Sequence, residues 1–96
     1  MGGARDDVVF KALADAGRRR LLDSIRARNG RTLGDLCEGM DMSRQAVAKH
    51  LRQLEAAGLV VSKRIGREKH HYLNPLPIFQ IEARWFLQFD YKAWMR

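Results

Sequence analysis

The sequence has few of the features that mark secreted or membrane-spanning proteins. Its 96 residues contain a single cysteine, Cys37, which cannot form a disulfide within the chain. The N-terminal residues lack the apolar core of a signal peptide, and the longest unbroken apolar runs are three residues long, as in residues 59–61. We therefore expect a protein of the reducing cytoplasm that neither crosses nor enters a membrane.

Catalytic motifs are also missing. The sequence has no glycine-rich phosphate loop, no serine or cysteine placed with a spaced histidine and acid, and no pair of acids isolated among apolar residues. Phosphoryl transfer, nucleophilic catalysis and general acid-base catalysis depend on such patterns. We therefore expect no enzymatic activity and no catalytic residues.

The composition is that of one small folded domain with an excess of positive charge. Hydrophobic residues make up 46% of the chain and charged residues 30%, which argues against disorder and fits a single domain over residues 1–96. Eighteen Lys and Arg residues oppose eleven Asp and Glu residues, so the net charge is +7. Residues 44–74 hold seven basic and two acidic residues and thus carry +5 of it. This excess favours a polyanionic partner, either nucleic acid or an acidic membrane surface.

The apolar periodicity predicts a mostly α chain with one small β-hairpin. Apolar residues recur at helical spacing before residue 58 and again near the C-terminus, whereas residues 59–73 are rich in β-branched residues around a Gly-Arg dipeptide. The predicted order of elements is α-α-α-α-β-β-α. The expected helices cover about 6–15, 18–28, two turns after Thr32, 44–57 and 78–94.

Two of these helices have the spacing of a helix-turn-helix, over about residues 32–57. Thr32, with Asp35 three residues later, forms a capping-box pattern at the start of the short helix, and Ser43 is placed to cap the longer one. A tight turn of about four residues separates them, and Gly58 ends the second helix. In this motif the second helix enters the major groove of DNA.

The longer helix has an apolar face and an opposite basic face. At 100° per residue, Leu51 and Leu54 lie within about 40° of Val47, whereas Lys49 and Arg52 lie roughly opposite. No acid interrupts the polar face near its N-terminal end, which a recognition helix inserts into the groove. Basic solvent-exposed faces are common, so this face alone favours an ordinary surface helix.

Residues 59–73 predict a hairpin with a basic tip. A two-residue loop at Gly66-Arg67 places Arg64 directly opposite Lys69, and this like-charge pair costs folding stability. Its simplest explanation is an external anion. A basic hairpin that follows a recognition helix is a wing, which contacts phosphates or enters the minor groove. The same loop sets the remaining pairs as Ile65 with Glu68, Lys63 with His70, Ser62 with His71, Val61 with Tyr72 and Val60 with Leu73.

Several motifs carry a family resemblance. The most specific is Met42-Ser-Arg-Gln-Ala-Val-Ala-Lys-His-Leu, which is followed by the Gly66-Arg67 loop and Tyr72-Leu-Asn-Pro, and an earlier one is Phe10-Lys-Ala-Leu-Ala-Asp. Over about residues 8–80 the sequence resembles the ArsR/SmtB family of bacterial winged helix-turn-helix repressors. The resemblance implies a homodimer of the bacterial cytoplasm that binds double-stranded operator DNA and represses transcription.

The helix-turn-helix, the wing and the resemblance together predict the residues that contact DNA. A symmetric dimer places two recognition helices in successive major grooves, about 34 Å apart. Arg44 and Gln45 are the candidates for base edges, because Arg suits guanine and Gln suits adenine. Lys49, Arg52 and the wing are expected to hold phosphates. The full set of expected DNA contacts is Ser43, Arg44, Gln45, Lys49, His50, Arg52, Lys63, Arg64, Arg67 and Lys69.

The start of the second helix departs from the family pattern. Many members have Pro-Thr before the Arg run, where Pro sets the first turn and Thr caps it. This chain has Ala16-Gly17 instead. We expect Asp15 to take over the capping, with the same fold.

The residues of the family's metal sites are incomplete. A thiolate site needs at least two sulfur donors; Cys37 matches the first cysteine of the family's box, but Gly39 stands at the second. The family's other site uses the last helix, which here offers only Glu82 and Asp90. We expect no metal and no cofactor. The alternatives are a metal- or redox-responsive sensor that uses Cys37, a winged helix that binds proteins, and an RNA-binding protein.

The C-terminal segment, about residues 78–94, predicts a dimer interface. Six of the eight aromatic residues fall between positions 79 and 94, and they need more than one face of a helix. A small domain cannot cover both faces, so a second copy is expected to cover one, although packing within one domain is the alternative. The expected interface residues are Val8, Val9, Phe10, Ile78, Phe79, Ile81, Trp85, Phe86, Phe89 and Trp94.

Overall fold

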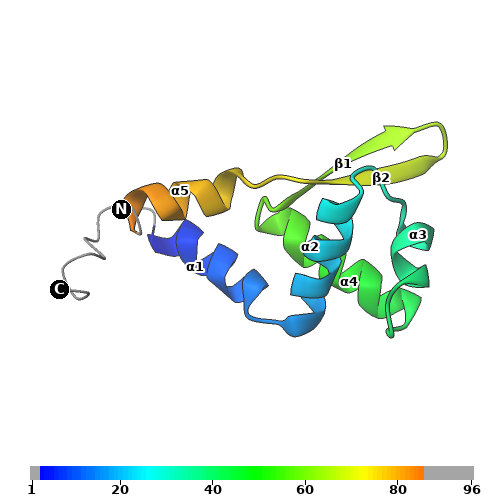
Figure 1. The fold of residues 1–96 in the computed structure, drawn as a ribbon, viewed down its shortest axis with the longest axis horizontal. Helices are drawn as coiled ribbons and strands as arrows, with labels where there is room; N and C mark the ends of the chain where they lie inside the picture. Colours follow the sequence, from blue (N-terminus) through cyan, green and yellow to red (C-terminus); the bar gives the residue numbers. More distant parts are fainter. Residues whose placement is uncertain (1–2, 86–96) are drawn as a thin grey trace.

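The computed structural model describes residues 3–85 and contains, within them, five helices and one antiparallel hairpin (Figure 1). This order confirms the predicted winged helix-turn-helix. No helix in the described part of the chain has the length and apolarity to cross a membrane. The elements are α1 (Gly3–Leu13), α2 (Ala16–Ala27), α3 (Leu33–Glu38), α4 (Arg44–Ala56), β1 (Val60–Ile65), β2 (Glu68–Leu73) and α5 (Leu76–Arg84).

Side-chain caps set the starts of α2, α3 and α4 as the sequence predicts. The carboxylate of Asp15 accepts from the backbone N–H of Arg18 at 3.0 Å, and the Ser43 hydroxyl accepts from that of Ala46 at 3.1 Å. Thr32 and Asp35 form a complete capping box. The backbone N–H of Arg18 holds the pKa of Asp15 below its usual value, and the backbone N–H of Thr32 does the same for the pKa of Asp35.

The ends of three helices differ from the predicted ends. The first helix ends at Leu13 because Asp15 is extended, as a cap of α2 must be, and α2 begins at Ala16 rather than at residue 18. The last helix begins at Leu76, directly after Pro75. Its predicted continuation over residues 86–94 lies outside the described residues.

The core lies where α2, α3 and α4 meet the base of the hairpin. Leu21, Ile25 and Leu36 are fully buried there, together with Leu54 of α4 and Leu59. Helices α1 and α5 lie side by side at one end of the molecule, whereas α3 and the hairpin tip lie at the other (Figure 1). Burial of this apolar surface is the main source of the fold's stability.

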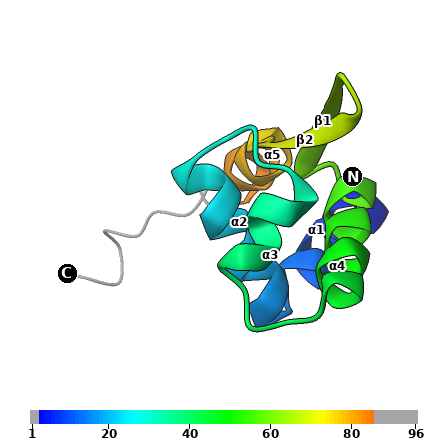
Figure 2. The same cartoon turned by 90° about the vertical axis from the view of Figure 1, so that its right-hand side faces the viewer.

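The hairpin has the predicted register at all six pairs, and Gly66 supplies the positive φ (+63°) that its two-residue loop requires. It projects beyond the helices α3 and α4 (Figure 2). Its base is tied to the α2–α3 loop by an isolated bridge between Arg31 and His71. The backbone N–H of His71 donates to the Arg31 carbonyl, and the N–H of Gly30 donates to the His71 carbonyl, each at 2.8 Å. The sequence did not predict this bridge.

Candidate nucleic-acid interface

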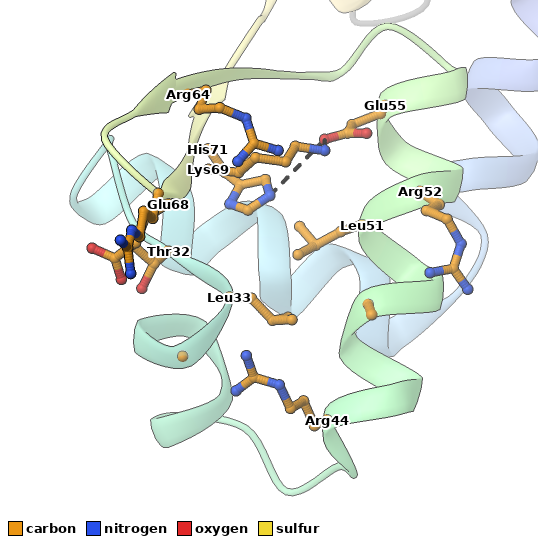
Figure 3. Close-up of a pocket in the computed structure, with 13 residues that line it drawn as sticks. Thr32, Leu33, Arg44, Leu51, Arg52, Glu55, Arg64, Glu68, Lys69 and His71 are labelled. Carbon is orange, nitrogen blue, oxygen red and sulfur yellow. Dashed lines mark ion pairs between the residues drawn. The ribbon is translucent and has the colours of Figure 1, made fainter.

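A groove of about 440 Å³ separates α4 from the wing (Figure 3). Leu33 and Leu51 form its floor between the two walls. One wall is α4, with Arg44, Ala48, Arg52 and Glu55, and the other is the wing, with Arg64, Arg67, Glu68 and Lys69. Five basic side chains therefore line a concave surface at the junction of the two elements that were predicted to bind DNA.

The predicted division of α4 into two faces is confirmed. Val47, Leu51 and Leu54 are buried in the core, whereas the polar residues of the opposite face are exposed. The exposed residues from the predicted set of DNA contacts are Ser43, Arg44, Gln45, Lys49 and Arg52. An exposed face that begins with a long donor and an amide is chemically able to read base edges in a major groove.

The wing also presents its basic residues to solvent. Lys63, Arg64, Arg67 and Lys69 are all exposed, and the Lys63 ammonium lies 5.6 Å from the centre of the Tyr72 ring. Arg64 and Arg67 lie on the side of the wing that faces α4. Guanidinium groups in this position suit phosphate oxygens, because they offer several donors in one plane.

The like-charge pair on the wing has an internal partner as well. Lys69 Nζ lies 3.6 Å from Glu55 Oε1 on α4 (Figure 3), so the external anion predicted as the simplest explanation of the pairing of Arg64 with Lys69 is not the one partner available to this pair. A carboxylate from α4 neutralises part of this charge. The predicted phosphate contact Lys69 is thus directed toward α4 by an ion pair.

Glu55 and His71 also line the groove, and neither was assigned a role there from the sequence. His71 is only 4% exposed, and its Nδ1 lies 2.9 Å from the Arg31 carbonyl oxygen. Because a carbonyl oxygen only accepts, Nδ1 must carry a proton and donate. The other ring nitrogen, Nε2, lies 3.9 Å from Glu55 Oε1. The one signal in the sequence was that helix 44–57 contains a single acid.

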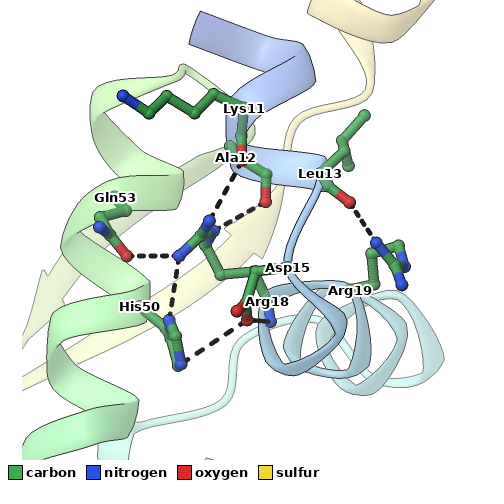
Figure 4. A network of polar contacts seen from close by, with 8 residues as sticks. All are labelled: Lys11, Ala12, Leu13, Asp15, Arg18, Arg19, His50 and Gln53. Carbon is green, nitrogen blue, oxygen red and sulfur yellow. Dashed lines mark hydrogen bonds and ion pairs between the residues drawn. The ribbon is translucent and has the colours of Figure 1, made fainter.

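His50 was predicted as a DNA contact, and the structure corrects this. Its ring faces α2, with Nδ1 3.4 Å from Arg18 Nη1 and Nε2 3.8 Å from Asp15 Oδ2 (Figure 4). The side chain is 18% exposed. The physical reason is its position about 60° from the centre of the apolar face, which directs it to the neighbouring helix instead of the groove.

Arg18 connects α4 to both preceding helices at the same place. Its guanidinium donates to the carbonyl oxygens of Lys11 (3.1 Å) and Ala12 (2.8 Å) and to Gln53 Oε1 (2.7 Å), as Figure 4 shows. The two carbonyls belong to the last turn of α1, where the Lys11 carbonyl also accepts from the backbone N–H of Ala14 at 3.2 Å. This network therefore fixes the position of α4 relative to α1.

The expected dimer interface needs correction at two residues. Val9 is 1% exposed and Ile81 is 4% exposed, because both pack into the chain's own core and cannot contact a partner. Asp6 and Arg84 form an ion pair that joins α1 to α5. The remaining described residues of the predicted interface are 37–57% exposed, namely Val8, Phe10, Ile78, Phe79 and Trp85. Phe86, Phe89 and Trp94 lie outside the described residues.

Cys37, the candidate for metal or redox sensing, is half-buried and packs against the core. Within residues 3–85, no three His, Cys, Asp or Glu side chains form a group that could hold a metal ion. Gly39, which stands at the position of the family's second thiolate, has no atoms within 4 Å of where a side chain would begin. The described residues thus offer one thiol at this place.

Known proteins are similar to this chain in both sequence and fold. A family model described as a helix-turn-helix domain matches residues 13–63. The uncharacterized HTH-type transcriptional regulator YuzN of Bacillus subtilis is 41% identical over 82% of this chain and 92% of its own. The transcriptional repressor SdpR of the same organism is 32% identical over 88% of this chain and 92% of its own.

Among solved structures, an ArsR-like transcriptional regulator from Rhodococcus sp. RHA1 matches 94% of this chain and 87% of its own, with a TM-score of 0.78 and 31% identity. The match therefore extends over the helix-turn-helix, the wing and the terminal helices together. The matched motifs, the fold and these relatives agree with one another. The chain belongs to the ArsR/SmtB family of winged helix-turn-helix transcriptional regulators.

Proposed function

We propose that this protein is a homodimeric repressor that binds a pseudo-palindromic DNA operator without a metal cofactor. The observation that carries the proposal is the groove between α4 and the wing, where two basic elements face the same volume. Two such elements supply more contacts to one duplex than either supplies alone. Of the seven basic and two acidic residues in residues 44–74, five basic and both acidic residues line this groove, so it carries a net charge of +3.

Contacts with DNA are assigned by position on the two elements. Arg44 and Gln45 lie in the first turn of α4, the part of a recognition helix that reaches base edges. Contacts with phosphates position the protein without reading sequence. We assign these to Lys49, Arg52, Lys63, Arg64 and Arg67, all of which are exposed.

A second copy is assigned to the surface of α1 and α5. Val8, Phe10 and Phe79 are each about half exposed there, and apolar surface of this kind favours association. A two-fold axis at this surface directs two α4 helices toward one side of the dimer, which suits an operator with two half-sites about 34 Å apart. Repression follows where such an operator overlaps a promoter, and the name of the relative SdpR supports this direction of control.

The absence of a metal cofactor is proposed from the residues themselves. A soft metal needs two or more sulfur donors, and Gly39 supplies none beside Cys37. The affinity of the protein for its operator is therefore expected to stay the same when zinc, cadmium or arsenite is added. A fall in affinity that the Cys37→Ser variant abolishes would support the alternative, a sensor that uses this thiol.

The experiment that tests the proposed function is the selection of bound duplexes from a random pool at a stated salt concentration. A consensus with two inverted half-sites is expected. Recovery of no enriched sequence would contradict the proposal and favour a winged helix that binds proteins. Preferential recovery of structured RNA from a mixed pool would favour the RNA-binding alternative.

A further inference from the structure

Glu55 is an acid in a groove whose other α4 charges, Arg44 and Arg52, are basic. Its Oε1 atom is buried and accepts no hydrogen bond from the described residues. Lys69 Nζ of the wing lies 3.6 Å from this atom, and His71 Nε2 lies 3.9 Å from it (Figure 3). The carboxylate thus connects the recognition helix to strand β2 by charge alone.

His71 cannot replace Lys69 as the partner of this carboxylate while its ring is neutral. Its Nδ1 proton is used on the Arg31 carbonyl, so the neutral ring directs an unprotonated Nε2 at Glu55. Among residues 3–85, Lys69 is then the group that faces Glu55 and is always charged. The ion pair therefore holds the Lys69 ammonium beside α4, whereas the position of β2 also depends on its backbone bridge to Arg31.

This arrangement affects DNA binding in two ways. A Lys69 ammonium that is held against α4 makes no phosphate contact, so the wing is left with one fewer counterion-releasing group. The same ion pair joins β2 of the wing to α4 and so helps to set the spacing between them. Operator binding needs that spacing, because base contacts from α4 and phosphate contacts from the wing must form together. Binding to random DNA relies on charge and is less sensitive to the spacing between the wing and α4.

We propose that Glu55 is a specificity-determining positioning residue, which holds Lys69 and the wing against α4 and thereby lowers the affinity for random DNA relative to the operator. This inference rests on the proposed function. It removes Lys69 from the expected phosphate contacts and gives a role to the acid that α4 contributes to the groove. The carboxylate acts through Lys69 and does not contact DNA.

Glu55→Gln is the direct test, because it removes the charge and keeps the shape of the side chain. On random duplexes the slope of log K against log salt should become steeper by about one unit per protomer, and the affinity should rise about eightfold per protomer at 0.1 M salt. The ratio of operator to random affinity should fall at least about fivefold. An unchanged slope and ratio would overturn the inference.

Glu68→Gln is the matched control. Glu68 also lines the groove and its removal changes the net charge by the same amount, but it is an exposed residue at the wing tip. Its loss should raise the affinities for operator and random DNA in parallel and leave their ratio unchanged. A fall in the ratio as large as that of Glu55→Gln would show a general charge effect and would overturn the inference.

Lys69→Gln tests the inference without altering a buried atom. In the wild-type background it should leave the salt slope unchanged, and in the Glu55→Gln background it should reverse the added unit of slope. A decrease of one unit in the wild-type background would mean that Lys69 already binds phosphate, and the inference would then be wrong. Wild-type protein that binds no duplex in a salt-dependent manner would instead contradict the proposed function itself.

Discussion

The guanidinium of Arg18 on α2 donates a hydrogen bond of 2.7 Å to the side-chain oxygen of Gln53 on the recognition helix. The same guanidinium donates to two carbonyls at the end of α1. Three helices therefore meet at one side chain, on the face of α4 that lies away from the groove. The position of the recognition helix depends on this contact as well as on the apolar core.

Replacing Arg18 should destabilise the protein. Arg18→Ala leaves the two α1 carbonyls without this donor and is expected to lower the free energy of unfolding by about 2 kcal/mol, since hydrogen bonds from charged groups are each worth about 1.5 to 3 kcal/mol and are not additive. Urea unfolding followed by circular dichroism measures the loss. Arg18→Lys keeps the charge but not the planar guanidinium group, so this variant should retain only part of the free energy of unfolding that Arg18→Ala loses. A loss below about 0.5 kcal/mol for Arg18→Ala would contradict the role of this network.

Arg44 is expected to read a base. Arg44→Ala should lose about 1 to 3 kcal/mol of binding free energy at the selected operator and should relax the preference for one base pair in each half-site. Binding isotherms on the operator and on its single-base variants measure both effects. Lys49→Ala is the control and should weaken operator and random duplexes equally. Equal losses for Arg44→Ala on both kinds of duplex would remove Arg44 from the base-reading residues.

Arg67 at the wing tip is expected to bind a phosphate. Arg67→Ala should weaken binding to every sequence alike and should flatten the slope of log K against log salt by about one unit per protomer. Titrations at four salt concentrations give the slope. Arg26→Ala on the exposed surface of α2 removes the same charge outside the groove and should leave the slope unchanged. Equal slopes for the wild type and Arg67→Ala would contradict the phosphate contact.

The apolar surface of α1 and α5 is expected to hold the dimer together. Phe79 is 57% exposed on α5, so Phe79→Asp should yield a folded monomer by sedimentation equilibrium. Val61→Asp makes the same kind of change on the exposed face of the wing and should leave the dimer intact. An intact Phe79→Asp dimer would place the interface elsewhere.

Asp35 should make the stability of the protein depend on pH in the acid range. Hydrogen bonds from the backbone N–H and the hydroxyl of Thr32 hold the pKa of Asp35 below its usual 3.8. A lowered pKa in the folded state stabilises the fold above pH 3.8, and this contribution is lost as the pH falls from about 4 through the folded pKa. The Asp35→Asn variant should thus unfold at a lower urea concentration than the wild type at pH 7. Its stability should also depend less on pH below pH 4.

The matched control for Asp35→Asn is Asp23→Asn, because the Asp23 carboxylate lies on the exposed surface of α2. This control should keep the wild-type pH dependence of the urea midpoint between pH 7 and pH 2.5. The role assigned to the capping box would be contradicted if Asp35→Asn and wild-type protein lost stability in parallel over that range.

Local interactions made much of the fold predictable from the sequence. Asp15, Thr32 and Ser43 cap helices three residues or fewer away, and the Gly66-Arg67 loop sets the strand register, so these features could be read from short segments. The polar and apolar faces of α4 follow from helical periodicity for the same reason.

Contacts between residues distant in the sequence were not predictable in the same way. The pairs of Arg18 with Gln53 and of His71 with the Arg31 carbonyl join residues 35 and 40 positions apart. Periodicity also could not decide which apolar residues of α1 and α5 face the core. Val9 and Ile81 proved to be core residues because the tertiary packing selects one of several possible apolar faces.

The exposed face of α4 and the wing are expected to bind one DNA duplex together. The most direct measurement is the affinity of the wild-type protein for its selected operator and for a scrambled duplex of the same composition, at several salt concentrations. We expect a preference for the operator of about a thousandfold or more, together with a steep decline of both affinities with salt. Equal affinities for the two duplexes, or affinities independent of salt, would contradict it.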